Sequence, residues 1–207
     1  DTRKTKTASP FARDELLDFF PTKKFLLKID SANVLNNGTV PARLAGKILK
    51  EMKWEYPSEL VYKNDLMVLD LLANNNWNRP IYIAITVPGS AYMGLEDFFQ
   101  VEGLAYRTVP VKVDEVDGFY GRIESEIMFD NLMNKFKWGG VTDHKVYLDE
   151  NNKRMLSNFR SSFTRLAFKL IKEEKNDSAR KVIERSVLLA IMIGLLSACF
   201  SAQIPEV

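Results

Sequence analysis

Residues 69–111 read LDLLANNNWNRPIYIAITVPGSAYMGLEDFFQVEGLAYRTVPV, and this stretch decides the predicted fold of the 207-residue chain. An apolar run that predicts a helix is followed by an asparagine-rich bend and then by PIYIAIT, residues 80–86. That run is rich in β-branched residues and uninterrupted, which is typical of a strand buried on both faces. Such strands occur mainly in parallel sheets covered by helices, so the stretch predicts an α/β fold with a small, mostly parallel sheet.

The segments before this stretch predict one strand and two helices. Apolar side chains alternate with others over residues 24–30, which predicts a strand. A helix is predicted from Pro41, because Leu44, Ile48 and Met52 recur four residues apart and form one stripe. A second helix is predicted from Asn64 as its N-cap. It is apolar nearly all round, so we expect it to be covered on more than one side.

The segments after this stretch predict a last strand and then mainly helix. Residues 105–111 predict the strand, and helix is expected again from Gly121. The strongest helix is predicted at residues 155–172, where apolar side chains recur at three- and four-residue steps: Leu156, Phe159, Phe163, Leu166, Ala167 and Leu170. A partner helix from Asn176 or Asp177 would complete an antiparallel hairpin that resembles one tetratricopeptide unit.

These segments predict four parts of the chain. They are a polar N-terminal tail at 1–20, an α/β domain at 21–120, a helical region with the tetratricopeptide-like hairpin at 121–186, and an apolar C-terminal tail at 187–207. The apolar core of the tail is about fourteen residues long, against the roughly twenty that a membrane span needs. We expect a packed final helix there, with a membrane segment or a misplaced export signal as alternatives.

Composition excludes several classes of protein and of site. Twenty-nine basic and twenty-seven acidic residues give a net charge of +2, which disfavours a nucleic-acid binder. A single cysteine excludes an intramolecular disulfide and a multi-cysteine zinc site. The only histidine, His144, has no second histidine to share a metal with, so we expect neither a metal nor a cofactor.

Candidate ligand residues gather around the asparagine-rich bend. The amides of Asn75 and Asn76 can bond a polyhydroxylated ligand, Trp77 offers a face on which a sugar can stack, and Arg79 adds a charge. The competing interpretation is that these residues close the preceding helix, with Arg79 paired to a carboxylate. Two residues near predicted strand ends, Glu102 and Tyr106, complete the candidate set, because α/β sheets bind ligands at strand ends.

No catalytic residue is predicted. Glu96 and Asp97 are neighbours on a predicted helix and point apart, whereas acid and base catalysis needs two carboxylates that converge on one substrate. A hydrolase is therefore the weakest of the functional hypotheses.

Several sequence motifs resemble those of a known family. They are VLDLLANNNWNRPIYIA, GLEDFFQVEGLAYRTVPV, NKFKWGG, YLDEN and the following RM. In this order they are similar to the DUF2723 family of Bacteroidetes membrane proteins over about residues 20 to 186. That family resembles protein O-mannosyltransferase-type glycosyltransferases, in which a multi-span membrane domain precedes a soluble extracytoplasmic region that ends in tetratricopeptide-like helices.

The resemblance implies a location and a function. The family's transferase centre lies upstream of the matching motifs, so the expected function is a non-catalytic accessory domain that binds or orients the acceptor protein or glycan. Its expected partners are that acceptor and the membrane domain of the parent chain, with no nucleic acid. It would be membrane-associated and face the periplasm. The alternative is a tetratricopeptide-like protein–protein interaction module.

Overall fold

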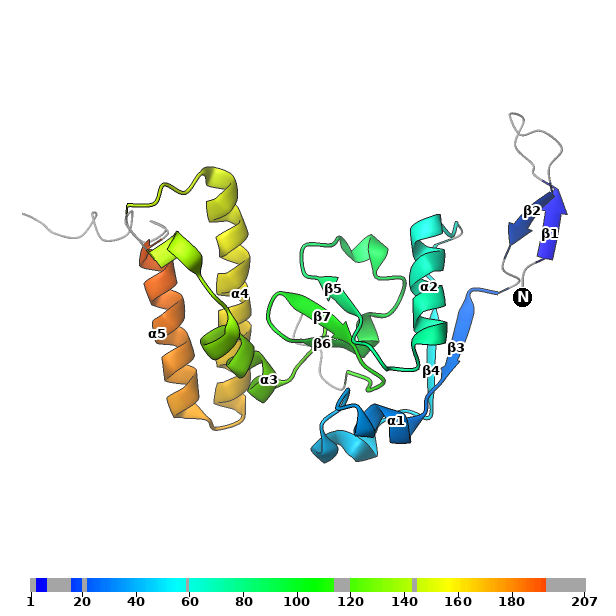
Figure 1. The fold of residues 1–207 in the computed structure, drawn as a ribbon, viewed down its shortest axis with the longest axis horizontal. Helices are drawn as coiled ribbons and strands as arrows, with labels where there is room; N and C mark the ends of the chain where they lie inside the picture. The colour runs from blue at the N-terminus through cyan, green and yellow to red at the C-terminus, as the bar shows by residue number, and fades with distance from the viewer. Residues whose placement is uncertain are drawn as a thin grey trace, which may run out of the picture. The chain divides into compact units, whose positions relative to one another are not determined.

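The structure is a computed structural model that describes residues 3–6, 16–19, 22–58, 60–113, 120–142 and 145–192 (Figure 1). Contacts divide the chain into two compact units of mixed α and β structure. The first unit comprises Asp1–Pro80, Pro88–Phe98 and Val109–Lys112, and the second comprises Ile81–Val87, Phe99–Thr108 and Val113–Val207. The chain therefore passes between the units several times, whereas the sequence predicts four consecutive parts with boundaries after residues 20, 120 and 186.

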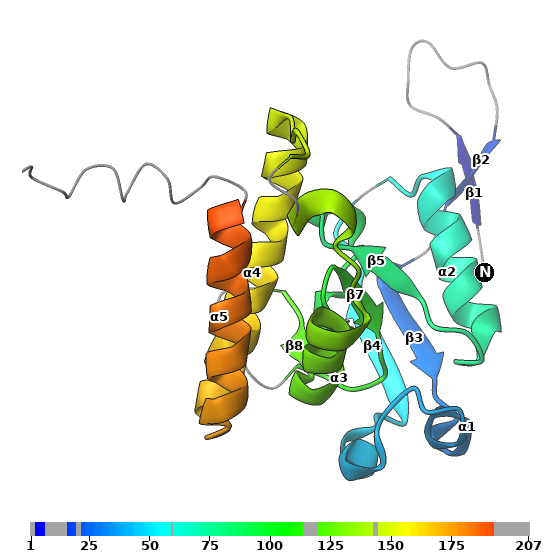
Figure 2. The same cartoon turned by 60° about the vertical axis from the view of Figure 1, so that its left-hand side comes forward.

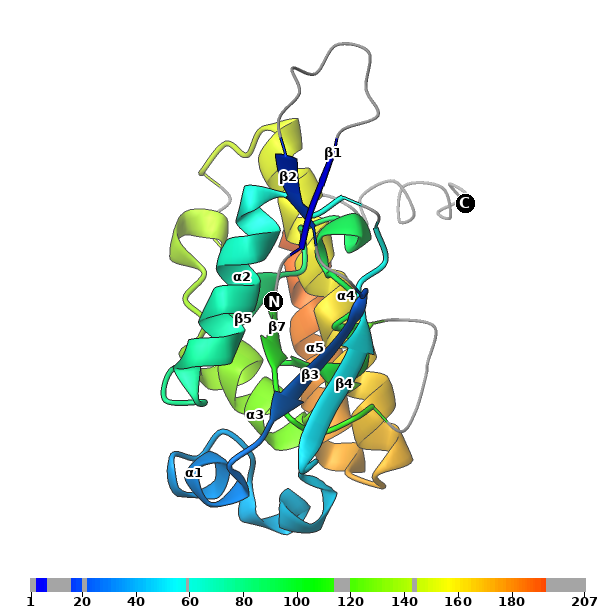
Figure 3. The same cartoon turned by 90° about the vertical axis from the view of Figure 1, so that its right-hand side faces the viewer.

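Two antiparallel strand pairs belong to the first unit. Strand β1 (Arg3–Lys6) pairs with β2 (Leu16–Phe19), so the predicted polar tail contains regular structure. Strand β3 (Lys24–Lys28) pairs with β4 (Glu51–Glu55), and the two lie side by side in Figure 3. The strand predicted at residues 24–30 is thus confirmed.

The helix predicted from Pro41 is wrong beyond its first turns. A 3-10 helix, η1, spans Ala42–Lys47 and ends before β4. Met52 and Trp54 alternate with charged residues as a strand requires, and Met52 is fully buried. Pairing with β3 satisfies the backbone and buries this face, and these gains outweigh the four-residue spacing that suggested a helix.

Helices α1 (Ser31–Asn36) and α2 (Lys63–Asn75) complete the first unit, with short 3-10 helices η2 (Gly89–Ala91) and η3 (Glu96–Phe98). Helix α2 has Tyr62 as its N-cap, two residues before the predicted N-cap Asn64, and the Asp65 carboxylate accepts the Tyr62 N–H at 3.1 Å. Asp65 also accepts the Tyr56 hydroxyl at 2.7 Å. The expectation that α2 is covered on several sides is wrong, because three of its apolar side chains are exposed: Leu66, Met67 and Leu71.

A four-stranded sheet belongs to the second unit, in the order β5-β7-β6-β8. Its strands are β5 (Tyr82–Ala84), β6 (Phe99–Val101), β7 (Ala105–Thr108) and β8 (Arg122–Ile123). Strand β7 pairs antiparallel with both β5 and β6, and only β6 and β8 are parallel.

The prediction of a mostly parallel sheet with residues 80–86 at its centre is therefore wrong. Strand β5 lies at the edge, where Tyr82 is 48% exposed. A tight turn through Gly103, at φ +127°, joins β6 directly to β7, and such a short link permits only antiparallel pairing. An apolar β-branched run shows that a strand forms, but it does not fix the direction of its neighbours.

Most of the other described residues of the second unit are helical. Helix α3 (Ser125–Asp130) continues as a π-helix, η4 (Asn131–Lys135), and a 3-10 helix, η5, spans Gly139–Thr142. Helices α4 (Glu150–Lys172) and α5 (Asn176–Met192) form an antiparallel hairpin, seen in Figure 2.

The stripe predicted in α4 is confirmed as the buried face of the hairpin. Its buried members are Leu156, Phe163, Leu166, Ala167 and Leu170. Residues 187–192 of the predicted apolar tail continue α5, whereas residues 193–207 and His144 lie outside the described residues.

Candidate functional site

The six predicted ligand residues do not form one described site, because they belong to different units. Asn75, Asn76, Trp77 and Arg79 lie in the first unit. Glu102 and Tyr106 lie in the second.

The asparagine-rich bend is held by its own hydrogen bonds. The Asn75 side chain donates to the Arg79 carbonyl at 2.6 Å and accepts the Arg79 N–H at 3.1 Å. Asn76 and Trp77 adopt left-handed backbone conformations, with φ of 42° and 62°. The carbonyl of Trp77 accepts the side-chain amide of Asn37 at 2.6 Å. These bonds end helix α2 and anchor the bend to the residues that follow α1.

Trp77 does not present its ring to solvent. The residue is only 7% exposed, which removes the reason for selecting it as a surface for sugar stacking. The competing interpretation, that the bend closes a helix, accounts for the amide contacts of Asn75 and for Asn76 as the left-handed C-cap of α2, whose carbonyl accepts the Asn33 side chain. Arg79 is exposed and makes no ion pair with a residue that the structure describes, so its ligand role stays a prediction.

Glu102 lies at the centre of a polar network on the sheet of the second unit. Its carboxylate accepts the Tyr82 hydroxyl at 2.6 Å and the Gln100 amide at 2.7 Å, and it lies 3.5 Å from the Arg107 guanidinium. The strand register places four polar residues in one row across the sheet. Tyr82 on β5 pairs with Arg107 on β7, Arg107 pairs with Gln100 on β6, and Gln100 pairs with Arg122 on β8.

The network continues from Gln100 to a second carboxylate. Arg122 donates to the Gln100 side chain at 2.6 Å and lies 3.2 Å from the Glu124 carboxylate. Gln100 is fully buried, and Glu102 and Glu124 are 7% and 5% exposed. Two guanidinium groups balance the two carboxylates, as buried charges require.

The chemistry of this network favours a structural role. Burial, followed by the hydrogen bond to Glu102, raises the pKa of Tyr82 to about 12, so the phenol stays protonated and donates. The Glu102 carboxylate is already occupied by donors and is a poor general base. Tyr106 stacks on Phe99 with ring centroids 5.2 Å apart and is 7% exposed, so it belongs to the core.

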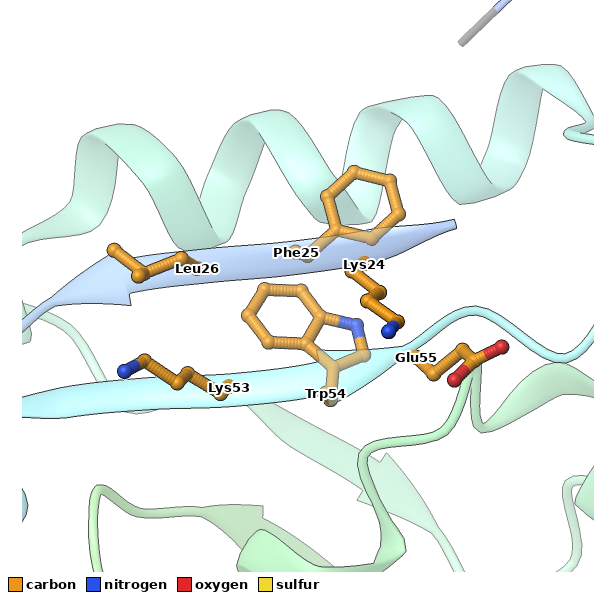
Figure 4. Close-up of a pocket in the computed structure, with 6 residues that line it drawn as sticks. All are labelled: Lys24, Phe25, Leu26, Lys53, Trp54 and Glu55. Atoms are coloured by element: carbon orange, nitrogen blue, oxygen red, sulfur yellow. The ribbon is translucent and has the colours of Figure 1, made fainter. Parts of the chain in front are cut away.

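A pocket that sequence reasoning missed lies on the β3–β4 pair (Figure 4). Its volume is about 310 Å³, and its lining residues are Lys24, Phe25, Leu26, Lys53, Trp54 and Glu55. Phe25 opposes Trp54 in the strand register, and their rings stack with centroids 5.4 Å apart and planes at 18°. The signal for this pair was the alternation of Met52, Trp54 and Tyr56 with charged residues.

Charged side chains border the ring pair on both sides. Lys24 opposes Glu55 on one side of it, and Leu26 opposes Lys53 on the other. Lys53 forms an exposed ion pair with Glu51 at 2.8 Å, and the hydrogen bond from Lys53 lowers the pKa of Glu51. Figure 4 places the indole nitrogen of Trp54 on the side of Lys24 and Glu55.

The indole N–H of Trp54 is buried and has no hydrogen-bond acceptor among the described residues. A buried donor without an acceptor is destabilising by about 1–3 kcal/mol, and its burial keeps it out of direct contact with a ligand. The pocket combines the aromatic surface of Phe25 and Trp54 with ammonium donors and a carboxylate acceptor.

Residues 1–127 match the family model of TMEM260-associated domain 2. The chain belongs to the TMEM260-associated domain 2 family. The residues matched to this TMEM260-associated domain include the β3–β4 pocket and the Glu102 network, and the α4–α5 hairpin lies outside them. Neither a curated protein nor a solved structure matches the chain. TMEM260-associated domain 2 is a different family from DUF2723, so the resemblance to DUF2723 stays a prediction.

Two further findings apply to the described part of this TMEM260-associated domain. No group of three histidine, cysteine, aspartate or glutamate side chains is placed to hold a metal ion there. None of the helices described is both long enough and apolar enough to cross a membrane.

Proposed function

We propose that this chain is a non-catalytic extracytoplasmic accessory domain of a membrane glycosyltransferase-like protein, where it binds or orients the acceptor protein or glycan. Two observations support the proposed place in a membrane glycosyltransferase-like protein. The family is named for its association with TMEM260, and the sequence motifs resemble those of DUF2723. In this proposal the chain faces the periplasm and its second partner is the membrane domain of the parent chain.

The β3–β4 pocket is the observation that carries the proposed binding function. Ligand sites are concave and mainly apolar, with a few polar groups that fix the ligand's orientation. The stacked rings of Phe25 and Trp54 supply the apolar surface, which suits the C–H face of a sugar ring. Lys24, Lys53 and Glu55 can donate to or accept from hydroxyl or carboxylate groups at its border.

The size of the pocket limits what it can bind. Its volume of about 310 Å³ lies at the lower end of the ~300–1,000 Å³ range of ligand pockets. We therefore expect it to hold one sugar ring or one amino-acid side chain of an acceptor, with the rest of the acceptor outside the pocket.

A glycan array, followed by fluorescence titration of the bound glycans, tests this function. We expect Lys24→Gln to weaken binding about fivefold to tenfold, because it removes a charged donor from the pocket. Lys28→Gln is the matched control: it removes the same charge from the same exposed strand face, but Lys28 does not line the pocket. Phe25→Leu should weaken binding by removing one stacked ring.

Two outcomes would overturn the proposal. One is that neither the arrayed glycans nor acceptor glycopeptides bind the folded chain at millimolar concentration. The other is that Lys24→Gln and Lys28→Gln have equal effects, since binding would then reflect general charge and not the pocket.

The tetratricopeptide-like character of the α4–α5 hairpin is a separate proposal. Its support is the pair of antiparallel helices of 23 and 17 residues and the apolar groove between them. This groove favours the second candidate function, a protein–protein interaction module. Binding of a partner peptide that depends on the groove would test it.

A further inference from the structure

The α4–α5 hairpin has an apolar groove that is lined by the buried residues Phe163 and Ala167 and by exposed apolar side chains around them. The groove has a volume of about 250 Å³, and its lining side chains include Phe168, Ile171, Ile183 and Val187. These four are 64%, 48%, 45% and 45% exposed. Single exposed apolar residues are common on proteins, but a contiguous set around a groove marks an interaction surface.

The hairpin is also far more basic than the chain as a whole. Residues 150–192 contain ten lysine or arginine residues and five aspartate or glutamate residues, a formal excess of five positive charges, against +2 for the whole chain. Only Arg165 of these basic residues is buried, so the surface of the hairpin keeps an excess of positive charge, which attracts a partner of opposite charge.

Two of these cations lie near opposite ends of the groove. Arg160 precedes the groove residue Thr164 by one turn of α4, and Arg180 precedes Ile183 by about one turn of α5. Because the helices are antiparallel, these two positions fall at opposite ends. Arg160 and Ile171 are eleven positions apart, which corresponds to ~16 Å along α4 at 1.5 Å per residue.

Both cations can interact with a partner. Arg160 makes no ion pair with a described residue. Arg180 lies 4.0 Å from Asp177 and 3.9 Å from Glu184, and all three side chains are more than two-thirds exposed. Exposed ion pairs of this kind contribute little to stability, so Arg180 can exchange them for an ion pair with a carboxylate of the partner.

We propose that this groove binds an amphipathic helix of about three turns from a partner protein, with an apolar stripe along its length and acidic residues at both ends. A second copy of the chain is a poor occupant, because two surfaces of excess positive charge would repel each other. The proposal is independent of the glycan-binding function, since it uses none of the residues of the β3–β4 pocket, and it rests on the second candidate function, whose partner it specifies.

Anisotropy titration of the whole chain with two labelled model peptides tests the proposal. Both peptides are helical with leucine at positions i, i+3, i+4 and i+7, and one has glutamate at both ends where the other has lysine. We expect the acidic peptide to bind at least about tenfold more tightly, and the difference to shrink as salt rises.

Substitutions connect the binding to the groove. Phe168→Ser should abolish binding of the acidic peptide, whereas Met155→Ser should leave it unchanged. Met155 is the matched control, because it is 62% exposed on the same helix and does not line the groove. The double substitution R160Q and R180Q should weaken binding of the acidic peptide and leave binding of the basic peptide unchanged.

Three outcomes would overturn the proposal. Equal binding of the two peptides, or equal effects of Phe168→Ser and Met155→Ser, would exclude a groove selective for an acidic helix. Phe168-dependent binding to phosphatidylserine vesicles without peptide binding would assign the face to a lipid surface. Phe168-dependent dimerisation in sedimentation experiments without peptide binding would assign it to a second copy.

Discussion

The hydroxyl of Tyr82 donates to the carboxylate of Glu102 at 2.6 Å, and this bond crosses over strand β7 to connect edge strand β5 with the end of β6. The ring of Tyr82 stays half exposed, while its hydroxyl is held by a carboxylate that is almost fully buried. The edge strand is thus attached to the sheet by a side chain in addition to its backbone ladder.

This bond predicts a loss of stability at high pH. Burial and the bond to Glu102 raise the pKa of Tyr82 to about 12 in the folded chain, from an ordinary value near 10. The stabilising contribution is therefore complete below about pH 10 and is lost as the pH rises through about 12. Denaturant unfolding at a series of pH values should show a smaller decline for Tyr82→Phe than for the wild type.

Tyr147→Phe is the control for this pH series, because Tyr147 is 87% exposed. Tyr56, whose pKa is likewise raised to about 12 by burial and by Asp65, should leave part of the decline in place. An identical pH profile for Tyr82→Phe and Tyr147→Phe would contradict the predicted coupling to Glu102.

Removal of the central carboxylate should destabilise the second unit. Glu102→Gln leaves the largely buried Arg107 without its counter-charge and weakens the acceptor for Tyr82, so we expect a loss of about 2–3 kcal/mol in the free energy of unfolding. Asp97→Asn should change it by less than about 0.5 kcal/mol, because the Asp97–Lys112 pair is exposed. Chemical denaturation measures both, and similar values would exclude a special role for the network.

The asparagine-rich bend should respond to substitution as a structural element. Trp77→Ala removes a nearly fully buried side chain and should lower the free energy of unfolding by about 3–5 kcal/mol. Asn74→Ala is the neighbouring control, because the Asn74 side chain bonds only within α2, to Asp70. If Trp77→Ala left the melting temperature unchanged but reduced glycan binding, the result would support the ligand role predicted for the bend and contradict the structural one.

Gly94 should not tolerate a side chain. Its φ is +80°, and an added Cβ would lie 2.2 Å from the carbonyl oxygen of Glu55, a backbone atom of the residue that ends β4. Gly94→Ala is therefore expected to lower the free energy of unfolding by about 2–4 kcal/mol, because the added side chain strains the backbone and displaces this segment. Gly46→Ala should be close to neutral, since its Cβ would meet no atom within 4 Å and its φ is not positive. Thermal unfolding of the two variants compares them, and equal melting temperatures would show that the Gly94 segment moves freely.

Local patterns in the sequence predicted some elements and not others. The buried stripe of α4 was predictable, because a long amphipathic helix repeats its signal over many turns. Strand β4 was not: Met52 continues the four-residue spacing of Leu44 and Ile48, while the same residue also begins the alternation that suits a strand. The pairing of Trp54 with Phe25, far upstream in the chain, decides between the two periods.

The candidate site depended on contacts between residues distant in the sequence. The buried position of Trp77 follows from its packing and from donors such as Asn37, forty residues away. The β3–β4 pocket requires the strand register that sets Phe25 against Trp54, and no short motif contains both. Glu102 was selected for a ligand role from its place near a strand end, but its polar partners come from three different strands.

Amide NMR mapping of the folded chain with a glycan found on the array locates the glycan-binding residues. We expect chemical-shift changes to concentrate at residues 24–26 and 53–55, and we expect Lys24→Gln to reduce them while Lys28→Gln does not. Changes centred on residues 75–79 instead, or no changes at a saturating glycan concentration, would contradict glycan binding in the β3–β4 pocket.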